Sequence, residues 1–248
     1  MMHAWGITDI GLVRKENQDA YMIHETPVRT VCVVCDGMGG AAGGQLASQI
    51  ATKTFMEEAE KVLTPEMEPE QLRSACAYAV SLANNAIRSA AEETEAYRNM
   101  GTTLVAAVSY EGGVVVTNVG DSRAYHICEN GITRVTKDHS LVERMVDRGD
   151  ITAEEARRHP NRNLITRALG PDADAKCDGY ICPMKAGEYL LLCTDGLVNT
   201  VTDQEMLFEI LHGGDEESCL SRLLAIAKEH GAPDNVTAVL MRQTEGGQ

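Results

Sequence analysis

Four aspartates of this chain stand where an apolar, strand-like run begins or ends beside small residues. They are Asp36 after VCVVC, Asp121 in TNVGDSR, Asp195 in LLLCTDG and Asp234 in APDNVTAVL. A fifth, Asp19, lies in RKENQDA. A single aspartate beside glycine or asparagine is usually a turn residue. Because the same placement recurs, we interpret the five as candidates for one shared site.

Carboxylates that converge in space repel one another, so they must be protonated, paired or bound to cations. A ligand set made of oxygen atoms, without histidine or cysteine, favours ions such as Mg²⁺ or Mn²⁺. Two such ions about 3.5–4 Å apart can bridge a water, lower its pKa and direct it at a phosphorus atom. The aspartates therefore predict a binuclear metal site in a hydrolase that needs no protein nucleophile.

The glycines that follow Asp36, in the run DGMGGAAGG, raise the alternative of a nucleotide-binding loop. A P-loop requires Gly-Lys followed by serine or threonine, and no lysine of this chain follows a glycine. The run also lacks G-x-G-x-x-G in the required register. The glycines still permit a close backbone approach to a neighbouring group.

The charge of the chain argues against several classes of partner. Acidic residues outnumber basic ones 37 to 22, which gives a formal net charge of -15. This charge repels nucleic acid and anionic lipid but suits divalent cations. No apolar run reaches the length of about 18 residues that a membrane helix needs, and no signal peptide is recognisable. We expect a cytoplasmic protein that binds neither nucleic acid nor membrane.

The cysteines are predicted to be reduced. Five of the eight lie inside apolar strand or helix patterns, which is typical of buried thiols. Cys32 and Cys35 form a C-x-x-C pair, but three steps along a strand turn the two side chains to opposite faces. A metal or disulfide shared by this pair is therefore not expected.

The order of elements predicts an α+β fold. Strand-like runs cover 30–35, 103–110, 114–119, 123–128, 132–135, 179–182, 189–193 and 235–241, and helical patterns cover 45–60, 70–95, 203–211 and 217–230. Short glycine-containing links between strands favour antiparallel hairpins. The elements do not alternate strictly, so we expect antiparallel sheets with helices outside, in a single domain spanning 1–248. The segment from about 140 to 170 has short, charged helical pieces and is predicted to be a peripheral insert.

Eight motifs occur in the order found in one enzyme family. They are GLVRKENQDA (11–20), CDGMGG (35–40), GTT (101–103), NVGDSRAY (118–125), KDHS (137–140), ITRALG (165–170), CTDGL (193–197) and DNVT (234–237). On these motifs the chain resembles the metal-dependent type 2C serine/threonine protein phosphatases, in their compact bacterial form. The resemblance implies a four-layer αββα sandwich with a small flap at about 140–170. It also implies phosphorylated proteins as substrates, a cognate Ser/Thr protein kinase and a monomer.

The resemblance also implies a role for each candidate metal ligand. Asp36 would bridge two Mn²⁺ or Mg²⁺ ions. Gly37 would give its backbone carbonyl to the second ion, and Asp195 and Asp234 would complete the first. Asp121, with Asp195, would form a weaker third metal site.

Two further residues are assigned by the same resemblance. Asp19 would hold a water bound to a metal. Arg14 would grip the substrate phosphate, a role that suits the fixed fork of a guanidinium.

The chain departs from the family at four positions. Many relatives have Glu at Gln18 and at Gln45, and His at Ala41. Many eukaryotic relatives have a histidine, a candidate general acid, at Met38. A methionine cannot donate a proton, so the leaving group must be protonated by a water bound to a metal or by another group. None of these changes removes a predicted metal ligand.

Two other functions and one other residue compete with this interpretation. Ser122 in GDSRA is a near miss of the G-x-S-x-G nucleophile elbow, although the last glycine is absent and strands flank it on both sides. A pseudophosphatase would bind phosphoproteins without hydrolysing them, but it predicts lost metal aspartates. His139 is a candidate catalytic residue, but its occurrence in the DHS turn is adequately explained by capping of the helix that follows.

Overall fold

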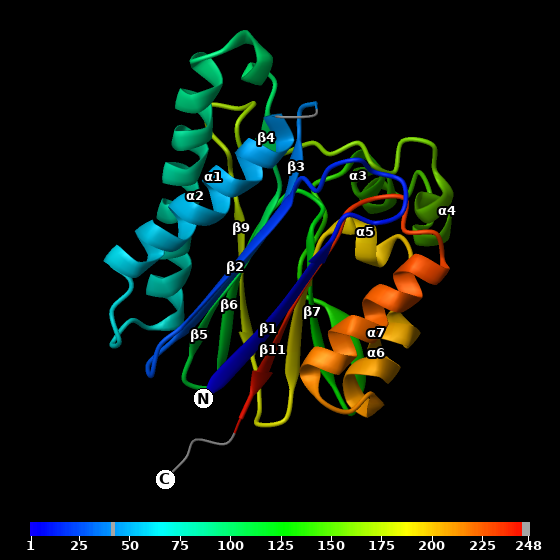
Figure 1. The fold of residues 1–248 in the computed structure, drawn as a ribbon. Coiled ribbons are helices and arrows are strands. Elements are labelled where there is room, and N and C mark those ends of the chain that lie inside the picture. Colours follow the sequence, from blue (N-terminus) through cyan, green and yellow to red (C-terminus); the bar gives the residue numbers. More distant parts are fainter. Residues whose placement is uncertain (41–42, 245–248) are drawn as a thin grey trace.

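Two antiparallel β-sheets lie face to face at the centre of the molecule, with helices outside them (Figure 1). The computed structural model describes residues 1–40 and 43–244. The first sheet has the strand order β1 (Met2–Asp9), β11 (Val236–Gln243), β10 (Tyr189–Cys193), β7 (Arg123–Cys128) and β8 (Gly131–Arg134). The second has β2 (Asp19–Glu25), β3 (Thr30–Met38), β5 (Leu104–Tyr110), β6 (Gly113–Val119) and β9 (Asp178–Pro183), and β4 (Gly101–Thr102) pairs with β3. All of these pairs are antiparallel. The short links at 111–113 and 129–131 form the predicted hairpins β5–β6 and β7–β8. The hairpin predicted at the link 120–122 is wrong, because this link joins β6 to β7 in the other sheet.

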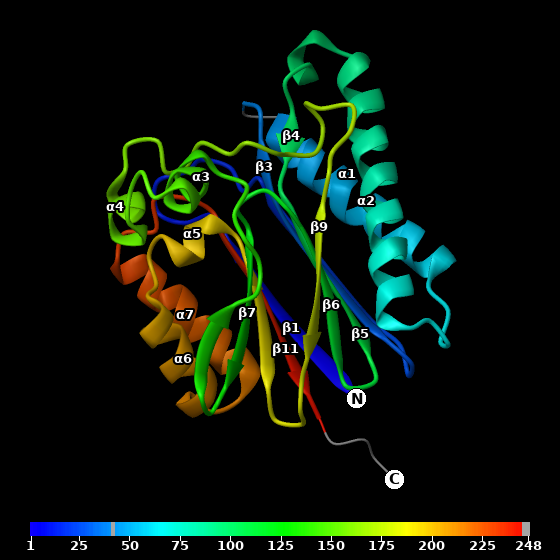
Figure 2. The same ribbon diagram turned by 180° about the vertical axis from the view of Figure 1, so that it is seen from behind.

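Helices cover the outer side of each sheet. The second sheet is covered by α1 (Gly43–Val62) and α2 (Pro69–Glu92), which is followed by the 3₁₀ turn η1 (Glu95–Tyr97). The first sheet is covered by α5 (Asp195–Val198), α6 (Asp203–His212) and α7 (Glu216–Glu229). Figure 2 shows these two helical layers on opposite sides of the paired sheets. The predicted four-layer αββα sandwich is confirmed.

Three apolar layers join the four structural ones. One lies between α1, α2 and the second sheet, one between α5 to α7 and the first sheet, and one between the two sheets. Since β3 and β5 are covered on both faces, their sequences are continuous aliphatic runs without alternation. No helix in the described ranges is both long and apolar enough to cross a membrane.

The predicted insert contains α3 (Leu141–Arg148) and α4 (Ala153–Arg158). Each helix begins at a residue that caps it. Ser140 Oγ accepts a hydrogen bond from the backbone N–H of Glu143, and Thr152 forms a reciprocal capping box with Glu155. The two helices lie near the end of the sandwich at which β3 ends (Figure 1).

The sequence patterns missed three strands. Neither β1, β2 nor the two-residue β4 was predicted, whereas the strand at 30–35 and its central neighbours were. The helix predicted over 70–95 ends three residues earlier, and η1 begins after two non-helical residues. Cys32 packs between the sheets and Cys35 packs toward α1 and α2, so the opposite faces expected of the C-x-x-C pair are confirmed. The departure at Ala41 lies outside the described residues.

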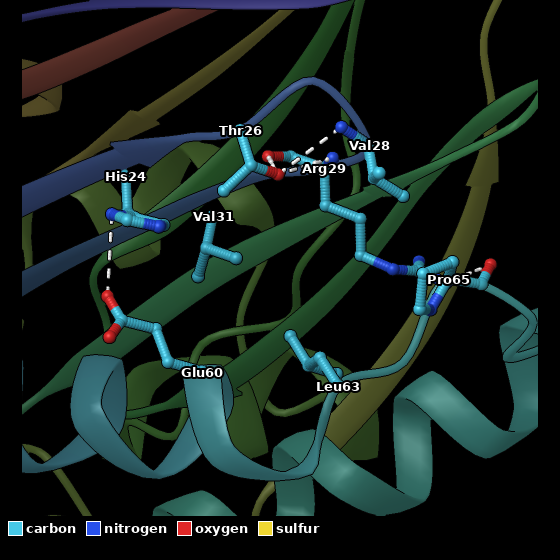
Figure 3. A pocket seen from close by; sticks show the side chains of 8 residues that line it. All are labelled: His24, Thr26, Val28, Arg29, Val31, Glu60, Leu63 and Pro65. Carbon is cyan, nitrogen blue, oxygen red and sulfur yellow. Dashed lines mark hydrogen bonds and ion pairs between the residues drawn. The ribbon is translucent and has the colours of Figure 1, made fainter.

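A buried arginine ties the far end of this sandwich together. Arg29, which is 8% exposed, lies in the turn between β2 and β3. Its guanidinium donates to the carbonyls of Ser109, Thr64, Pro65 and Met67 at 2.8–3.3 Å. Figure 3 shows it reaching from the turn to the connection between α1 and α2, beside Pro65. The guanidinium of Arg29 therefore satisfies backbone carbonyls from two segments, so we predict that Arg29 stabilises the fold.

Replacing Arg29 with methionine should lower the free energy of unfolding by about 3 kcal/mol, because several carbonyls lose their donor. Denaturant unfolding measures this. Arg98→Met is the matched control, since Arg98 pairs with Glu95 on the surface, and it should change stability by less than about 0.5 kcal/mol. Equal losses of unfolding free energy in the two variants would show that the buried contacts of Arg29 stabilise the fold no more than a surface ion pair does.

Candidate metal centre

Strand ends bring the predicted aspartates to one end of the sandwich. Asp36 lies near the end of β3, Asp121 follows β6, Asp195 follows β10 and Asp234 precedes β11. Because β10 and β11 are antiparallel neighbours, the end of one lies beside the start of the other. In the second sheet, the register of β2 and β3 places Asp19 opposite Asp36. The fold therefore gathers carboxylates from both sheets.

A cleft of about 510 Å³ opens at this point. Its lining includes every predicted metal ligand and the predicted phosphate-binding residue, namely Arg14, Asp36, Gly37, Asp121, Asp195 and Asp234. Asp19 is 9% exposed and does not line the cleft. Its carboxylate instead lies close enough to those of Asp36 and Asp195 to interact with them electrostatically. All seven predicted site residues thus belong to one region.

Burial and mutual repulsion raise the pKa of four of these carboxyl groups. Burial, followed by the charges of Asp19 and Asp195, holds the pKa of Asp36 well above its ordinary value. Burial and neighbouring carboxylates also raise the pKa of Asp19 to about 7 and that of Asp121 to about 8. The pKa of Asp195 is raised by burial and by the charge of Asp234. Groups crowded in this way bind either protons or cations.

The donor atoms of the cluster suit a hard divalent ion. Within the described residues, Asp19 Oδ1 and Asp195 Oδ1 are buried and have no hydrogen-bond partner. An unpaired buried carboxylate oxygen is costly unless an ion or a water contacts it. Gly37 lines the same cleft, and a Cβ atom there would overlap the carbonyl oxygen of Gly44. The close approach of β3 to α1 at this point requires glycine.

Arg14 and Asp234 form an ion pair, with 2.6 Å between Nη2 and Oδ2. The predicted phosphate-binding group and a predicted metal ligand thus contact each other directly. In the part of the chain that the structure describes, no three His, Cys, Asp or Glu side chains by themselves form a group that could hold an ion. An ion in this cleft would therefore need donors besides these side chains, and the contact with Arg14 occupies one oxygen of Asp234.

Threonines that the sequence analysis did not single out hold the aspartates in place. Thr103 Oγ1 accepts the backbone N–H of Asp36 at 2.9 Å, and Thr102 Oγ1 donates to the carbonyl of Asp36 at 2.8 Å. Thr194 Oγ1 donates to Asp19 Oδ2 at 2.9 Å. These contacts give the GTT and CTDG motifs a physical role. Short hydroxyls fix the backbone around Asp36 and one oxygen of Asp19.

Ser122 does not have the surroundings of a nucleophile. It lies in the turn from β6 to β7, so a strand and not a helix follows it. Its side chain is fully buried, and its Oγ lies 2.6 Å from Thr103 Oγ1. This arrangement disfavours the nucleophile-elbow alternative and makes Ser122 part of the frame around Asp36.

His139 has a positioning role that capping alone does not explain. The following Ser140 caps α3, as expected. The His139 ring, however, accepts the backbone N–H of Gly120 at Nδ1, 3.1 Å away. In the neutral ring Nε2 then carries the proton and donates to Asp178 Oδ2 at 3.2 Å. Burial lowers the pKa of His139, which favours this neutral form. The ring therefore holds the turn that leads into Asp121.

A second, larger cleft of about 830 Å³ separates α3 and α4 from the segment at 198–203. Asp121 and Asp195 line both clefts, so the two are continuous at the carboxylate cluster. The walls of the larger one combine small apolar residues with Arg157, Arg158 and Arg162. A bound polypeptide that extended from the carboxylate cluster along the larger cleft would contact the predicted flap.

The chain is similar to known proteins over nearly its whole length. The model of the family described as Protein phosphatase 2C matches residues 13–240. The serine/threonine phosphatase stp of Listeria monocytogenes is 35% identical over 244 residues, which cover 98% of this chain and 96% of that protein.

Solved structures are similar over nearly the whole chain. The serine/threonine phosphatase Stp1 from Staphylococcus aureus is 36% identical with a TM-score of 0.92, covering 99% of this chain and 96% of that chain. The catalytic domain of the serine threonine protein phosphatase PstP, in complex with 2 manganese ions, is 29% identical with a TM-score of 0.81. That likeness covers 98% of this chain and 99% of that chain. With its carboxylate cleft and this sandwich fold, the chain belongs to the protein phosphatase 2C family.

Proposed function

We propose that this chain hydrolyses phosphoserine and phosphothreonine on proteins, using a water activated by two divalent cations. The observation that carries the proposal is the convergence of four carboxylates and the guanidinium of Arg14 at one cleft of a protein phosphatase 2C member, with the carboxylate of Asp19 close behind. The serine/threonine phosphatase names of its relatives support the substrate class. The manganese ions in the PstP complex support the class of cation.

The cation ligands follow from the donor set in the cleft. Asp36, Asp195 and Asp234, with the carbonyl of Gly37, would hold two Mn²⁺ or Mg²⁺ ions, and Asp121 with Asp195 a weaker third. When bound, such ions supply a water of lowered pKa and positive charge beside the phosphoryl group. Release of Asp234 from Arg14 would free the guanidinium at the same time.

The remaining residues would orient the reactants. Arg14 would bind two phosphate oxygens through its planar fork. Asp19, with one oxygen held by Thr194, would use the other oxygen to orient the attacking water. Met38 lines the cleft but has no proton to donate, so a water in the cleft would protonate the leaving alkoxide.

The proposal extends to partners and surroundings. A phosphatase of this class would reverse the action of a cognate Ser/Thr protein kinase, and we expect it to act as a monomer in the cytoplasm. The pseudophosphatase alternative requires that a metal aspartate be missing. All five predicted aspartates are present in the chain and lie together, which favours the active enzyme.

Removing the cations should abolish hydrolysis of p-nitrophenyl phosphate and of a phosphothreonine peptide, and Mn²⁺ or Mg²⁺ should restore it, because the ions generate the nucleophile. Initial rates after exhaustive chelation test this expectation. Full activity in chelator would contradict the two-ion mechanism.

Asp36→Asn should lower kcat by at least a few hundredfold at saturating Mn²⁺, since the bridging carboxylate would contact both ions.

Replacing Arg157 and Arg158 together with alanine should change kcat/KM on phosphoproteins severalfold, because both side chains are exposed on α4 beside the larger cleft. Hydrolysis of p-nitrophenyl phosphate should stay within about twofold of the wild-type rate, since this substrate is too small to reach α4. Equal losses on both substrates would instead mean that the segment at 140–170 supports the metal site.

The metal-free protein should become less stable as the pH rises from 5.5 to 8.5. Asp19 and Asp121 hold protons in the folded state up to about pH 7 and 8, whereas in the unfolded chain they lose them near pH 4. Folding therefore takes up protons across this range, and the free energy of unfolding should fall by about 2 kcal/mol or more. Thermal unfolding in chelator measures the change.

Two variants of that experiment test its cause. Asp121→Asn should be more stable than the wild type at pH 8.5 without metal, because it removes one repelling charge. Saturating Mn²⁺ should remove the loss at high pH, since cations replace the protons. A metal-free melting temperature that rises steadily from pH 5.5 to 8.5 would contradict the crowding of the carboxylates.

A further inference from the structure

The loop at 10–18, between β1 and β2, carries Arg14 but has neither helix nor strand of its own. A guanidinium can hold a phosphate in line only if its backbone is fixed, because a misplacement of about 1 Å can cost two orders of magnitude in rate. The side chain of Arg14 is also about half exposed, so packing around it contributes little. Apart from its ion pair with Asp234, the position of Arg14 must therefore be set by contacts elsewhere in the loop.

One buried amide makes three hydrogen bonds to this loop. Asn235 Nδ2 donates to the carbonyls of Ile10 at 2.9 Å and Glu16 at 3.0 Å. Its Oδ1 accepts the backbone N–H of Gln18 at 2.9 Å. Asn235 is 5% exposed, so these bonds are shielded from water. A single side chain thus fixes the beginning and the end of the loop on either side of Arg14.

Backbone contacts place the same loop on the segment that precedes β11. The N–H of Leu12 donates to the carbonyl of Ala232 at 2.9 Å. A Cβ atom at Gly11 would overlap the carbonyl oxygen of Asp234, so the two backbones touch there. Asn235 follows Asp234 in sequence and therefore anchors the loop next to a predicted metal ligand.

We propose that Asn235 is a positioning residue for phosphate binding, which holds the loop so that the guanidinium of Arg14 meets the substrate phosphate. This inference rests on the proposed function, since it assigns Asn235 to the phosphate that Arg14 grips. An amide is required because it donates twice and accepts once. An aspartate keeps the acceptor for Gln18 but turns an oxygen toward the carbonyls of Ile10 and Glu16.

The kinetic test compares Asn235→Asp and Asn235→Ala with Arg14→Ala. Each single variant should raise KM for p-nitrophenyl phosphate and the inhibition constant of inorganic phosphate by about tenfold, with a smaller change in kcat. Adding Arg14→Ala to either Asn235 variant should change these constants by less than about threefold more, because both changes remove the same interaction. Fully multiplicative effects would overturn the proposal.

Asn84→Asp is the matched control. Asn84 is also a buried asparagine, and it donates to the carbonyl of Asp172 at 3.0 Å and accepts the N–H of Gly170 at 2.7 Å. Its loop does not carry Arg14, so this variant should lower the melting temperature but leave the phosphate inhibition constant within about twofold. An equal rise of that constant in Asn84→Asp would overturn the proposal, as it would reflect general destabilisation.

The Mn²⁺ dependence separates Asn235 from its neighbour Asp234. The Mn²⁺ concentration for half-maximal activity should change by less than about twofold in Asn235→Asp and Asn235→Ala, since neither removes a predicted ligand. A large rise in that concentration with an unchanged phosphate inhibition constant would overturn the proposal. Asn235 would then act on the ions and not on Arg14.

Limited trypsin digestion gives a readout that needs no activity. Arg14 and Lys15 provide cleavage sites within the loop itself. Mass spectrometry should detect cleavage after these residues about tenfold faster in Asn235→Ala than in the wild type and in Asn84→Asp, below the melting temperature of each. Unchanged cleavage would overturn the proposal. Faster cleavage in a protein without phosphatase activity would uphold the anchoring of the loop and refute the proposed function alone.

Discussion

The repulsion among carboxylates at one end of the sandwich is the constraint on which the site depends. Asp36, Asp195 and Asp234 approach one another from two sheets, and Asp19 lies close behind. Left to themselves, such groups would drive the strand ends apart. The raised pKa values of Asp19, Asp36 and Asp195 reflect burial and this repulsion, since bound protons relieve part of it. A divalent ion relieves more of it, because it attracts several carboxylates at once.

The rest of the fold supplies the rigidity that this crowding requires. Three apolar layers fix the two sheets relative to each other, so the strand ends cannot separate freely. At the site itself, small hydroxyls take over from apolar packing. Thr103 and Thr102 satisfy the backbone of Asp36, and Thr194 holds Asp19. The chain therefore accepts locally unfavourable electrostatics because the surrounding frame over-determines the backbone.

The sequence predicted the central strands and the carboxylates but not the edges or the supporting contacts. Strands such as β3 and β5 are buried on both faces and read as unbroken aliphatic runs. By contrast, β1 and β2 are edge strands, half-buried along most of their length. Their sequences MHAWGITD and DAYMIHE mix charged and apolar residues, so neither the helical nor the strand period of hydrophobicity is clear.

The aspartates were predictable because turn residues beside strand ends recur in the sequence. Asn235 and Thr194 were not, since their partners lie roughly two hundred residues away in the chain and only the fold brings them together.

The placement of Arg14 on Asp234 also bears on the order of binding. The whole chain is strongly acidic, and a cleft with this many carboxylates repels a phosphate dianion. One guanidinium cannot offset that charge, particularly while it is paired with Asp234. Two divalent cations would nearly neutralise the carboxylates and would also compete with Arg14 for Asp234. Cation binding would thus both reduce the repulsion of a phosphate and release Arg14, the residue proposed to bind it. The cations would then bind before the phosphoprotein, and the adjacency of Asp234 and Asn235 would place both binding events on one short segment.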